Sequence, residues 1–210
     1  MNLLRSRATA LVFVAGCMLL ALTVLSALPQ HAAPRVPGSE IVLAIDPAKS
    51  KVHWTLDTTL HNVHGTFALK NGEIHVDPSS GKASGEIVAD AGSGRSGNDS
   101  RDKKMHEEVL ESGKYPEVVF RPDHVDGTIS QQGIFTSQIH GIFVLQGKEH
   151  KISVPVEAEL SGDHWSGSGK FSVPFIDWGL KNPGTFFLKV NHAVEIELEL
   201  RGNLQSLPLQ

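Results

Sequence analysis

Histidines are the side chains in this 210-residue chain that most invite a metal-site hypothesis, because there are eleven of them. Five could meet in space as ligands: His61, His64, His140, His150 and His192. His61 and His64 have a ligand-like spacing, but no cysteine or acidic ligands accompany them at set spacings, as zinc sites usually require. His53 and His75, like His64, fall on the polar side of alternating strand patterns. We therefore predict no metal ligand.

Motifs for catalysis are missing from the sequence. It contains no Gly-x-Ser-x-Gly elbow and no His-Glu-x-x-His pair. The Gly/Ser-rich segment 91–97 carries Arg95 but lacks the Gly-Lys-Ser/Thr of a phosphate-binding loop. His106, followed by Glu107 and Glu108, is interpreted as part of an exposed helix face. We predict no catalytic residue and a protein that is not an enzyme.

Composition excludes other classes of protein. The formal net charge is −4, from 19 basic and 23 acidic residues, so no positive excess indicates nucleic-acid binding. Charged residues make up 20% and hydrophobic residues 40% of the chain, which excludes wholesale disorder. One cysteine cannot form an intrachain disulfide.

Strands must position whatever site exists, because hydrophobic residues alternate with polar ones from residue 46 onward. In Val194–Arg201, aliphatic side chains take one face and charged side chains the other. We predict eight or nine strands, near 51–59, 63–70, 72–78, 82–90, 117–126, 134–146, 149–160, 164–175 and 185–201. Asn71-Gly72 within Lys70–Glu73 predicts a tight hairpin turn. A closed antiparallel barrel and a two-sheet sandwich both fit this pattern.

One segment breaks the alternation and predicts a short helix over 99–112. The residues Asn98-Asp99-Ser100 can cap its start, and Gly113 is placed to end it. Its apolar edge is narrow and consists of Met105, Val109 and Leu110. Such a helix lies on a surface or over an opening.

The barrel or sandwich interior is expected to be aromatic. Four aromatic residues share the inward parity of their strands: Trp54, Phe67, Phe171 and Phe175. Phe120 and Phe143 lie in runs where both faces are partly apolar, so their direction stays open. Gly167 and Gly169 on the inward parity leave space, which favours a cavity. The pattern alone leaves a packed core and a ligand cavity both open.

Residues 1–38 differ from the rest of the chain. Arg5 and Arg7 precede an uncharged apolar run over 8–28, which is typical of an export signal. The run is also long enough to span a bilayer as an uncleaved anchor, and Cys17 lies in a sequence that resembles a lipoprotein cleavage box. All three alternatives place the following domain outside the cytoplasm, in a bacterial periplasm.

Five motifs over roughly residues 44–201 resemble, in order, those of the YceI-like lipid/polyisoprenoid-binding family. They are Ile45-Asp46-Pro47 with Ser50-Lys51-Val52 and Trp54, then Val63-His64-Gly65-Thr66-Phe67, then Ser100-Arg101-Asp102 through Tyr115-Pro116 to Phe120, then Phe143 to Val156, and Asp177-Trp178-Gly179. At the helix, Lys104-Met105 stand where many members have His-Leu. The role of that family histidine is therefore not carried over to this chain.

The resemblance implies a fold and a ligand class. The fold is all-β, an extended antiparallel lipocalin-like barrel of about eight strands with one short helix near 99–112. Residues 1–38 would be the export signal or membrane anchor with a linker, and 39–203 the barrel domain. The implied function is an exported protein that holds a long isoprenoid chain, a polyprenol or isoprenoid quinone, for carriage, storage or sequestration. Such a ligand is recognised by apolar burial, which needs no polar motif.

We expect twelve residues to line the apolar channel: Trp54, Leu56, Phe67, Leu69, Phe120, Phe143, Ile152, Val154, Gly169, Phe171, Val173 and Phe175. The expected partners are an isoprenoid lipid or quinone and the inner membrane nearby, without nucleic acid. A homodimer is left open, and no cofactor is expected beyond the bound lipid. The alternative is a metal- or His-dependent enzyme or stress protein on the same barrel.

Overall fold

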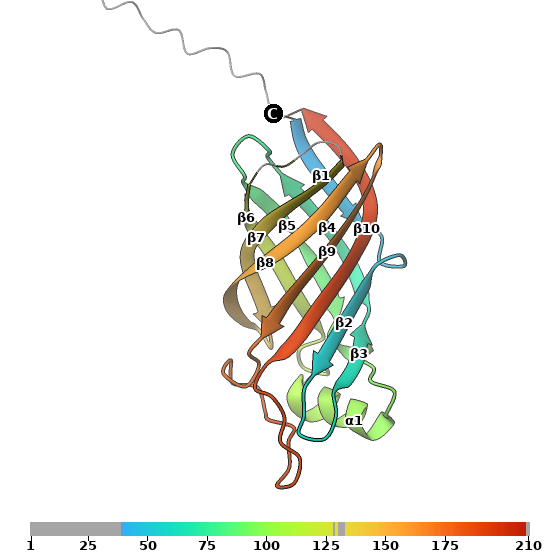
Figure 1. Ribbon diagram of the computed structural model, residues 1–210, viewed down its shortest axis with the longest axis vertical. Helices are drawn as coiled ribbons and strands as arrows, with labels where there is room; N and C mark the ends of the chain where they lie inside the picture. The colour runs from blue at the N-terminus through green and yellow to red at the C-terminus, as the bar shows by residue number, and fades with distance from the viewer. Residues whose placement is uncertain (1–38, 128, 130–132, 209–210) are drawn as a thin grey trace, which may run out of the picture. The chain divides into compact units, whose positions relative to one another are not determined.

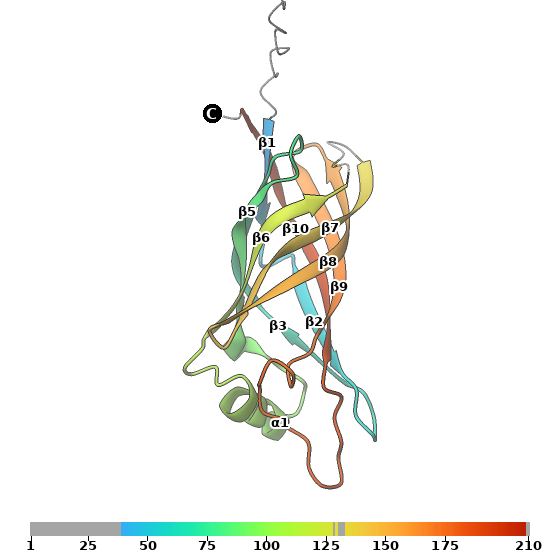
Figure 2. The same ribbon diagram turned by 90° about the vertical axis from the view of Figure 1, so that its left-hand side faces the viewer.

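The computed structural model describes residues 39–127, 129 and 133–208, so the predicted signal or anchor in 1–38 lies outside the described residues. Ten strands and one short helix make up this part of the chain (Figures 1 and 2). The strands are β1 (Ser39–Ile45), β2 (Lys51–Leu56), β3 (Val63–Phe67), β4 (Leu69–Val76), β5 (Ala83–Asp90), β6 (Glu117–Asp126), β7 (Gly133–Leu145), β8 (Lys148–Ser161), β9 (His164–Val173) and β10 (Val194–Pro208). Within these ranges, no helix has the length and apolar character needed to cross a bilayer.

The ten strands fill eight positions of a closed antiparallel barrel. The long strand β10 pairs with β2 along its first half and with β1 along its second half. On their other sides, β2 pairs with β3 and β1 pairs with β4. Segments β1 and β2 therefore share one strand position of the barrel, and β3 and β4 share the next. The remaining neighbours follow chain order from β4 to β10, which closes the sheet on itself. The predicted barrel is confirmed, and the sandwich alternative is excluded.

A hydrogen-bonded turn separates β1 from β2 while both stay attached to β10. The Asp46 carboxylate accepts the Ala48 backbone N–H at 3.0 Å. The Ser50 hydroxyl donates to the Asp46 carbonyl at 2.8 Å and accepts the Arg201 backbone N–H at 3.0 Å. Pro47, which has no N–H to give to a sheet, stands inside this turn. These contacts account for the polar residues of the first sequence motif.

The hairpin turn predicted at Lys70–Glu73 is wrong. Strand β4 continues through these residues and pairs with both β1 and β5. The irregularity that Asn71-Gly72 signalled is a register shift against β5 between Leu69 and Asn71. Asn and Gly suit bulges as well as turns, so only the partner strands distinguish the two.

Strand limits differ from the prediction at both ends of the barrel domain. Strand β1 was not predicted, since its residues follow a polar linker in the sequence. The last strand begins at Val194 rather than at 185, and it continues to Pro208, beyond the predicted domain end at 203. The residues before Val194 form loops instead, at the end of the barrel that carries the helix (Figure 1).

The helix is shorter than predicted. A 3₁₀ turn, η1 (Ala91–Ser93), precedes α1 (Asp99–Lys104), which widens into the π-helical turn η2 (Met105–Val109). The predicted cap is present, because the Asn98 side chain accepts the Arg101 backbone N–H at 3.0 Å. Glu111 has a left-handed φ of 48°, which ends the helical backbone before Gly113 is reached.

The interior of the barrel is hollow in its middle. Trp165 and Val173 are buried at either end of β9, whereas Gly169 and Phe171 between them are only half-buried although they face inward. Among the described residues, no large side chain is less than 2% exposed. A packed core would bury its central residues most completely, so the exposure pattern indicates an internal space.

Candidate functional site

The barrel encloses a cavity of about 630 Å³. Aliphatic and aromatic side chains from all the barrel strands form most of its wall, and strand alternation turns them inward. An eight-stranded barrel can either fill with side chains or hold one small ligand. A volume of this size lies within the usual range of ligand pockets, so the arrangement suits an apolar guest.

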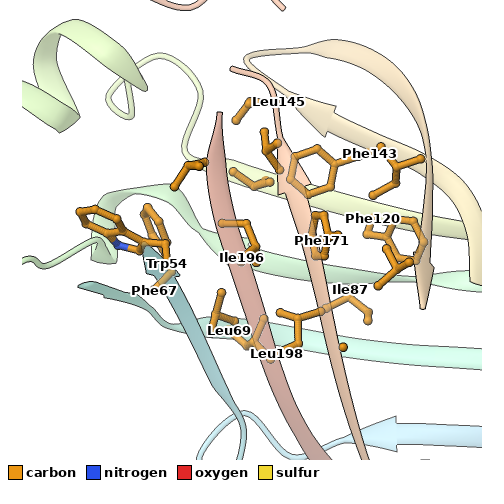
Figure 3. Close-up of a pocket in the computed structure, with 18 of the residues that line it drawn as sticks. Trp54, Phe67, Leu69, Ile87, Phe120, Phe143, Leu145, Phe171, Ile196 and Leu198 are labelled. Atoms are coloured by element: carbon orange, nitrogen blue, oxygen red, sulfur yellow. The ribbon is translucent and has the colours of Figure 1, made fainter. Parts of the chain in front are cut away.

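All twelve residues expected from the sequence line this cavity: Trp54, Leu56, Phe67, Leu69, Phe120, Phe143, Ile152, Val154, Gly169, Phe171, Val173 and Phe175. The structure also settles the direction of Phe120 and Phe143, which both point inward (Figure 3). The contact of these residues with a ligand remains a prediction.

Aromatic rings form pairs along the cavity wall. Phe143 packs edge-on against Phe171, with ring centroids 6.0 Å apart and an interplanar angle of 73°. Trp54 and Phe67 lie 6.5 Å apart on the paired strands β2 and β3. Figure 3 shows these rings turned into the cavity together with Ile196 and Leu198 of β10. Their broad apolar faces can contact hydrocarbon without any directional bond.

Close packing makes Gly65 part of this arrangement. A Cβ at Gly65 would stand 2.3 Å from the Arg95 carbonyl oxygen and 2.4 Å from the Trp54 ring. Only glycine therefore allows the Arg95 segment, which pairs with Thr66, to lie over β3. This contact is the physical reason for the glycine in the Val63–Phe67 motif.

Sequence reasoning missed the part of the wall that comes from the N-terminal strands and from β5. The missed residues include Ile41, Leu43, Ile74, Val76, Ile87 and Ala89. The alternation of Ile74 and Val76 was visible in the sequence, but Ile41 and Leu43 belong to the unpredicted strand β1. Period-two parity would have found them once β1 was recognised as a strand.

One end of the cavity is polar and lies beneath α1 and the neighbouring loops. Its lining includes Thr58, His61, Asn98, Ser100, Arg101, Lys104 and Thr185. Lys104 donates to the Pro183 carbonyl at 2.8 Å, which ties the helix to the loop after β9. Among the described residues that line the cavity there is no carboxylate. We call this end the mouth.

The helical segment covers the mouth, and its predicted apolar edge faces the cavity. Met105, Val109 and Leu110 all line the cavity, and Val109 is buried with only 7% exposed. The buried Asp102 carboxylate accepts the backbone N–H of Ser96 at 2.9 Å and also its hydroxyl. This acid therefore holds the loop before the helix in place, which gives the Ser100-Arg101-Asp102 motif a structural role.

The ten histidines of the described residues lie apart from one another or in pairs. Within the described ranges, no three His, Cys, Asp or Glu side chains are placed to share an ion. His64 contacts the Thr55 hydroxyl at 2.9 Å, and His61 lies at the mouth. His150 stacks on Trp178 with ring centroids 3.8 Å apart, and burial lowers the pKa of its imidazole below the ordinary value.

A Ser–His–Asp arrangement occurs away from the cavity, on β8, β7 and β6. The Ser153 Oγ lies 2.6 Å from His140 Nδ1, and His140 Nε2 lies 2.7 Å from Asp126 Oδ2. The hydrogen bond from His140 lowers the pKa of the Asp126 carboxyl. The Asp126 side chain is 56% exposed, so water screens the charge stabilisation on which such triads depend. The geometry therefore favours a surface hydrogen-bond cluster.

Comparisons with known proteins agree with the barrel. A sequence model of the YceI-like domain matches residues 43–202. Solved structures with this fold include BcnA of Burkholderia cenocepacia, at 18% identity and a TM-score of 0.62, covering 75% of this chain and 99% of BcnA. No curated protein showed significant sequence similarity.

Two further structures have the same fold at low identity. A polyisoprenoid-binding domain from Saccharophagus degradans, implicated in plant cell wall breakdown, matches at 14% identity and a TM-score of 0.60, covering 77% of this chain and 98% of that domain. The YceI protein of Campylobacter jejuni matches at 18% identity and a TM-score of 0.54, covering 69% and 86% of the two chains. At these identities the structural similarity establishes the barrel fold alone. The ligand of this chain has to be inferred from the residues that line its own cavity.

Proposed function

The chain belongs to the YceI-like family, and we propose that it holds a long isoprenoid chain, a polyprenol or isoprenoid quinone, in the barrel cavity. The observation that carries the proposal is the continuous apolar wall around about 630 Å³ of internal space. A binding protein, rather than an enzyme, is also what the family and the polyisoprenoid-binding neighbour suggest.

Hydrophobic burial alone can supply the affinity. Burying hydrocarbon contributes about 0.8 kcal/mol per CH₂, so about twenty carbons in the cavity would contribute on the order of 16 kcal/mol. Immobilising the ligand and the channel side chains offsets several kcal/mol of this gain. With an immobilisation cost near the lower end of its range of about 4–15 kcal/mol, the remainder exceeds the roughly 8 kcal/mol of a micromolar complex, without any hydrogen bond to the chain.

Carriage, storage or sequestration of such a lipid fits a location outside the cytoplasm and near the inner membrane of a bacterium. The support for this part of the proposal is Arg5 and Arg7 before the uncharged run over 8–28. Fusing residues 1–45 to a reporter that is active only after export tests it. Activity of the reporter is expected, and retention in the cytoplasm would contradict the proposed location.

Solvent extraction of the purified protein followed by mass spectrometry tests the ligand. We expect a prenyl lipid in near-stoichiometric amount, and metal analysis of the same preparation is the control. Protein that carries a bound transition metal and no lipid would favour the alternative, a metal- or His-dependent enzyme or stress protein on the same barrel. The homodimer stays a prediction, to be checked by light scattering.

A further inference from the structure

Large hydrophobic side chains are exposed on the loops at the mouth of the cavity. Phe186 is 92% exposed, Phe187 87% and Leu60 74%, and we call these three residues the apolar tip. In the described part of the chain, the one other large hydrophobic residue with such exposure is Ile134, near the start of β7 at the opposite end of the barrel (Figure 2). Exposed apolar groups gathered in one place indicate an interaction site.

The loops that carry the apolar tip form one projection. The Thr59 backbone N–H donates to the Lys189 carbonyl at 3.0 Å, and Thr58 pairs with Val190 as an isolated bridge. Figure 1 shows the β2–β3 loop and the loop before β10 side by side, extending past the barrel at the end where α1 lies. Leu60 is therefore carried on the same projection as the two phenylalanines.

The size and shape of the projection favour a lipid bilayer over a protein partner. Phe186 and Phe187 pack edge-on with centroids 5.1 Å apart, and two such rings can bury roughly 300–500 Å². A stable protein interface needs about 800 Å² on each partner, with a complementary surface opposite. Insertion into a bilayer interface needs only apolar groups that reach beyond the polar body.

The charges around the apolar tip suit anionic lipid. Residues 58–64 and 178–194 contain no acidic residue, although Asp57 and Asp177 border them, and they carry Lys181, Lys189 and three histidines, of which His192 lies 3.7 Å from Asp177. Lys181 contacts Glu108 at 2.6 Å, whereas exposed Lys189 has no carboxylate partner within the described residues. Lysine beside apolar residues can keep its stem in hydrocarbon and its ammonium at the phosphate level.

The apolar tip is continuous with the cavity. Three residues that line the mouth are close in sequence to the tip. His61 directly follows Leu60, Thr58 lies two residues before it, and Thr185 directly precedes Phe186. A bilayer that received the tip would therefore lie against the mouth. Hydrocarbon that passes directly between bilayer and cavity avoids exposure to water.

We infer that Leu60, Phe186 and Phe187 insert into the surface of an anionic lipid bilayer, so that the mouth of the cavity faces the lipid. The purpose of this contact rests on the proposed lipid cargo, but the contact itself requires no ligand in the cavity.

Site-specific fluorescence quenching tests the contact in the full-length protein. In a Cys17→Ser background, a single bimane label is attached at Phe187→Cys or, as the control, at Ile134→Cys. The vesicles contain phosphatidylcholine and phosphatidylglycerol, with a doxyl nitroxide on a fraction of the acyl chains. We expect strong loss of fluorescence at position 187 and little at position 134. Quenching at 187 that is absent, or no greater than at 134, overturns the inference.

A second variant separates loss of the contact from misfolding. With the label at Leu60→Cys, Phe186→Ser combined with Phe187→Ser should raise the lipid concentration for half-maximal quenching at least about tenfold. Ile134→Ser should leave this concentration unchanged, and the exposed positions predict unaltered melting temperatures for all these proteins. An unchanged lipid concentration, or quenching replaced by concentration-dependent dimerisation through the tip, contradicts the inference.

The outcome is independent of the proposed cargo. Neither Phe186 nor Phe187 lines the cavity, so their purified double serine variant should bind added detergent-solubilised prenyl lipid as tightly as the unaltered protein. Unaltered protein without lipid would contradict the proposed function and leave the quenching result standing.

Discussion

Replacing Gly169 with leucine distinguishes a ligand channel from a packed core. Gly169 lies on β9 with its Cα facing the cavity, between Leu198 on β10 and Val156 on β8. Its φ is outside the left-handed region, so leucine meets no backbone strain there. The new side chain must project into whatever space the barrel encloses.

The expected change in stability is small because two contributions oppose each other. A Cβ at this position stands 3.2 Å from the Pro155 carbonyl oxygen and from Val154 Cγ1, and 3.3 Å from Val156 Cγ1. Neighbours must yield by a few tenths of an ångström, which by analogy with overpacked cores costs about 1–3 kcal/mol. Burial of the leucine in the cavity contributes about 1.5–3 kcal/mol in the other direction. The free energy of unfolding should therefore change by less than about 2 kcal/mol.

The expected change in lipid binding is large. A leucine in the channel takes the room of about one isoprene unit, whose five carbons contribute roughly 4 kcal/mol of burial at 0.8 kcal/mol each. That loss corresponds to about a thousandfold weaker binding for a lipid that needs the whole channel. Urea unfolding and the extracted lipid-to-protein ratio should be measured on the same preparation.

Two matched variants complete the test. Gly169→Ala adds only the crowded Cβ, so it should retain lipid and report the contact strain alone. Gly113→Leu makes the same substitution where no atom lies within 4 Å, and it should change neither quantity. Full lipid occupancy in Gly169→Leu would refute the placement of lipid at Gly169, and a stability loss above about 3 kcal/mol would favour a packed core.

Three other substitutions test the helix, its loop and a half-buried ring. Val109→Asp should destabilise the fold by about 3 kcal/mol or more in urea unfolding, because it buries an unpaired charge, while Glu107→Asp on the exposed face should not. Asp102→Ala should lower the unfolding free energy by about 1–3 kcal/mol, since the N–H and hydroxyl of Ser96 lose their acceptor, and an unchanged value would disprove the role of the acid. Burial lowers the pKa of His150 in the folded state, so stability should be complete above the unfolded pKa of about 6.5 and fall as the pH drops below it. His150→Phe should flatten the melting temperature between pH 7.5 and pH 5; an equal slope in both proteins would contradict the assignment.

Much of the wall of the candidate site could be predicted from local pattern. Successive strand residues point to opposite faces, so the alternation around Trp54, Phe171 and Val173 predicted their shared face without any knowledge of neighbouring strands. The same property makes the all-β class readable from the sequence, whereas a barrel and a sandwich share the pattern. The Asn98 cap of the helix is equally local, because it forms within one turn.

Other features depended on which strands became partners. Asn71-Gly72 is compatible with a turn and with a strand irregularity, and pairing of β4 with β1 and β5 selected the second. The directions of Phe120 and Phe143 were also set by register, since they face each other across β6 and β7. Neither the strand irregularity at Asn71-Gly72 nor the direction of the two phenylalanines is determined by residues close in sequence, because both depend on which strands pair.

The sequence by itself determined which side chains share a face, because alternation is a property of the extended backbone of each strand. Only the tertiary structure decided that the shared face surrounds a space. That outcome depends on β10 closing the barrel against both β1 and β2, and on how far apart closure holds the opposing walls. The apolar tip likewise arises when the β2–β3 loop meets the loop before β10, two segments more than 120 residues apart that only closure of the barrel brings together.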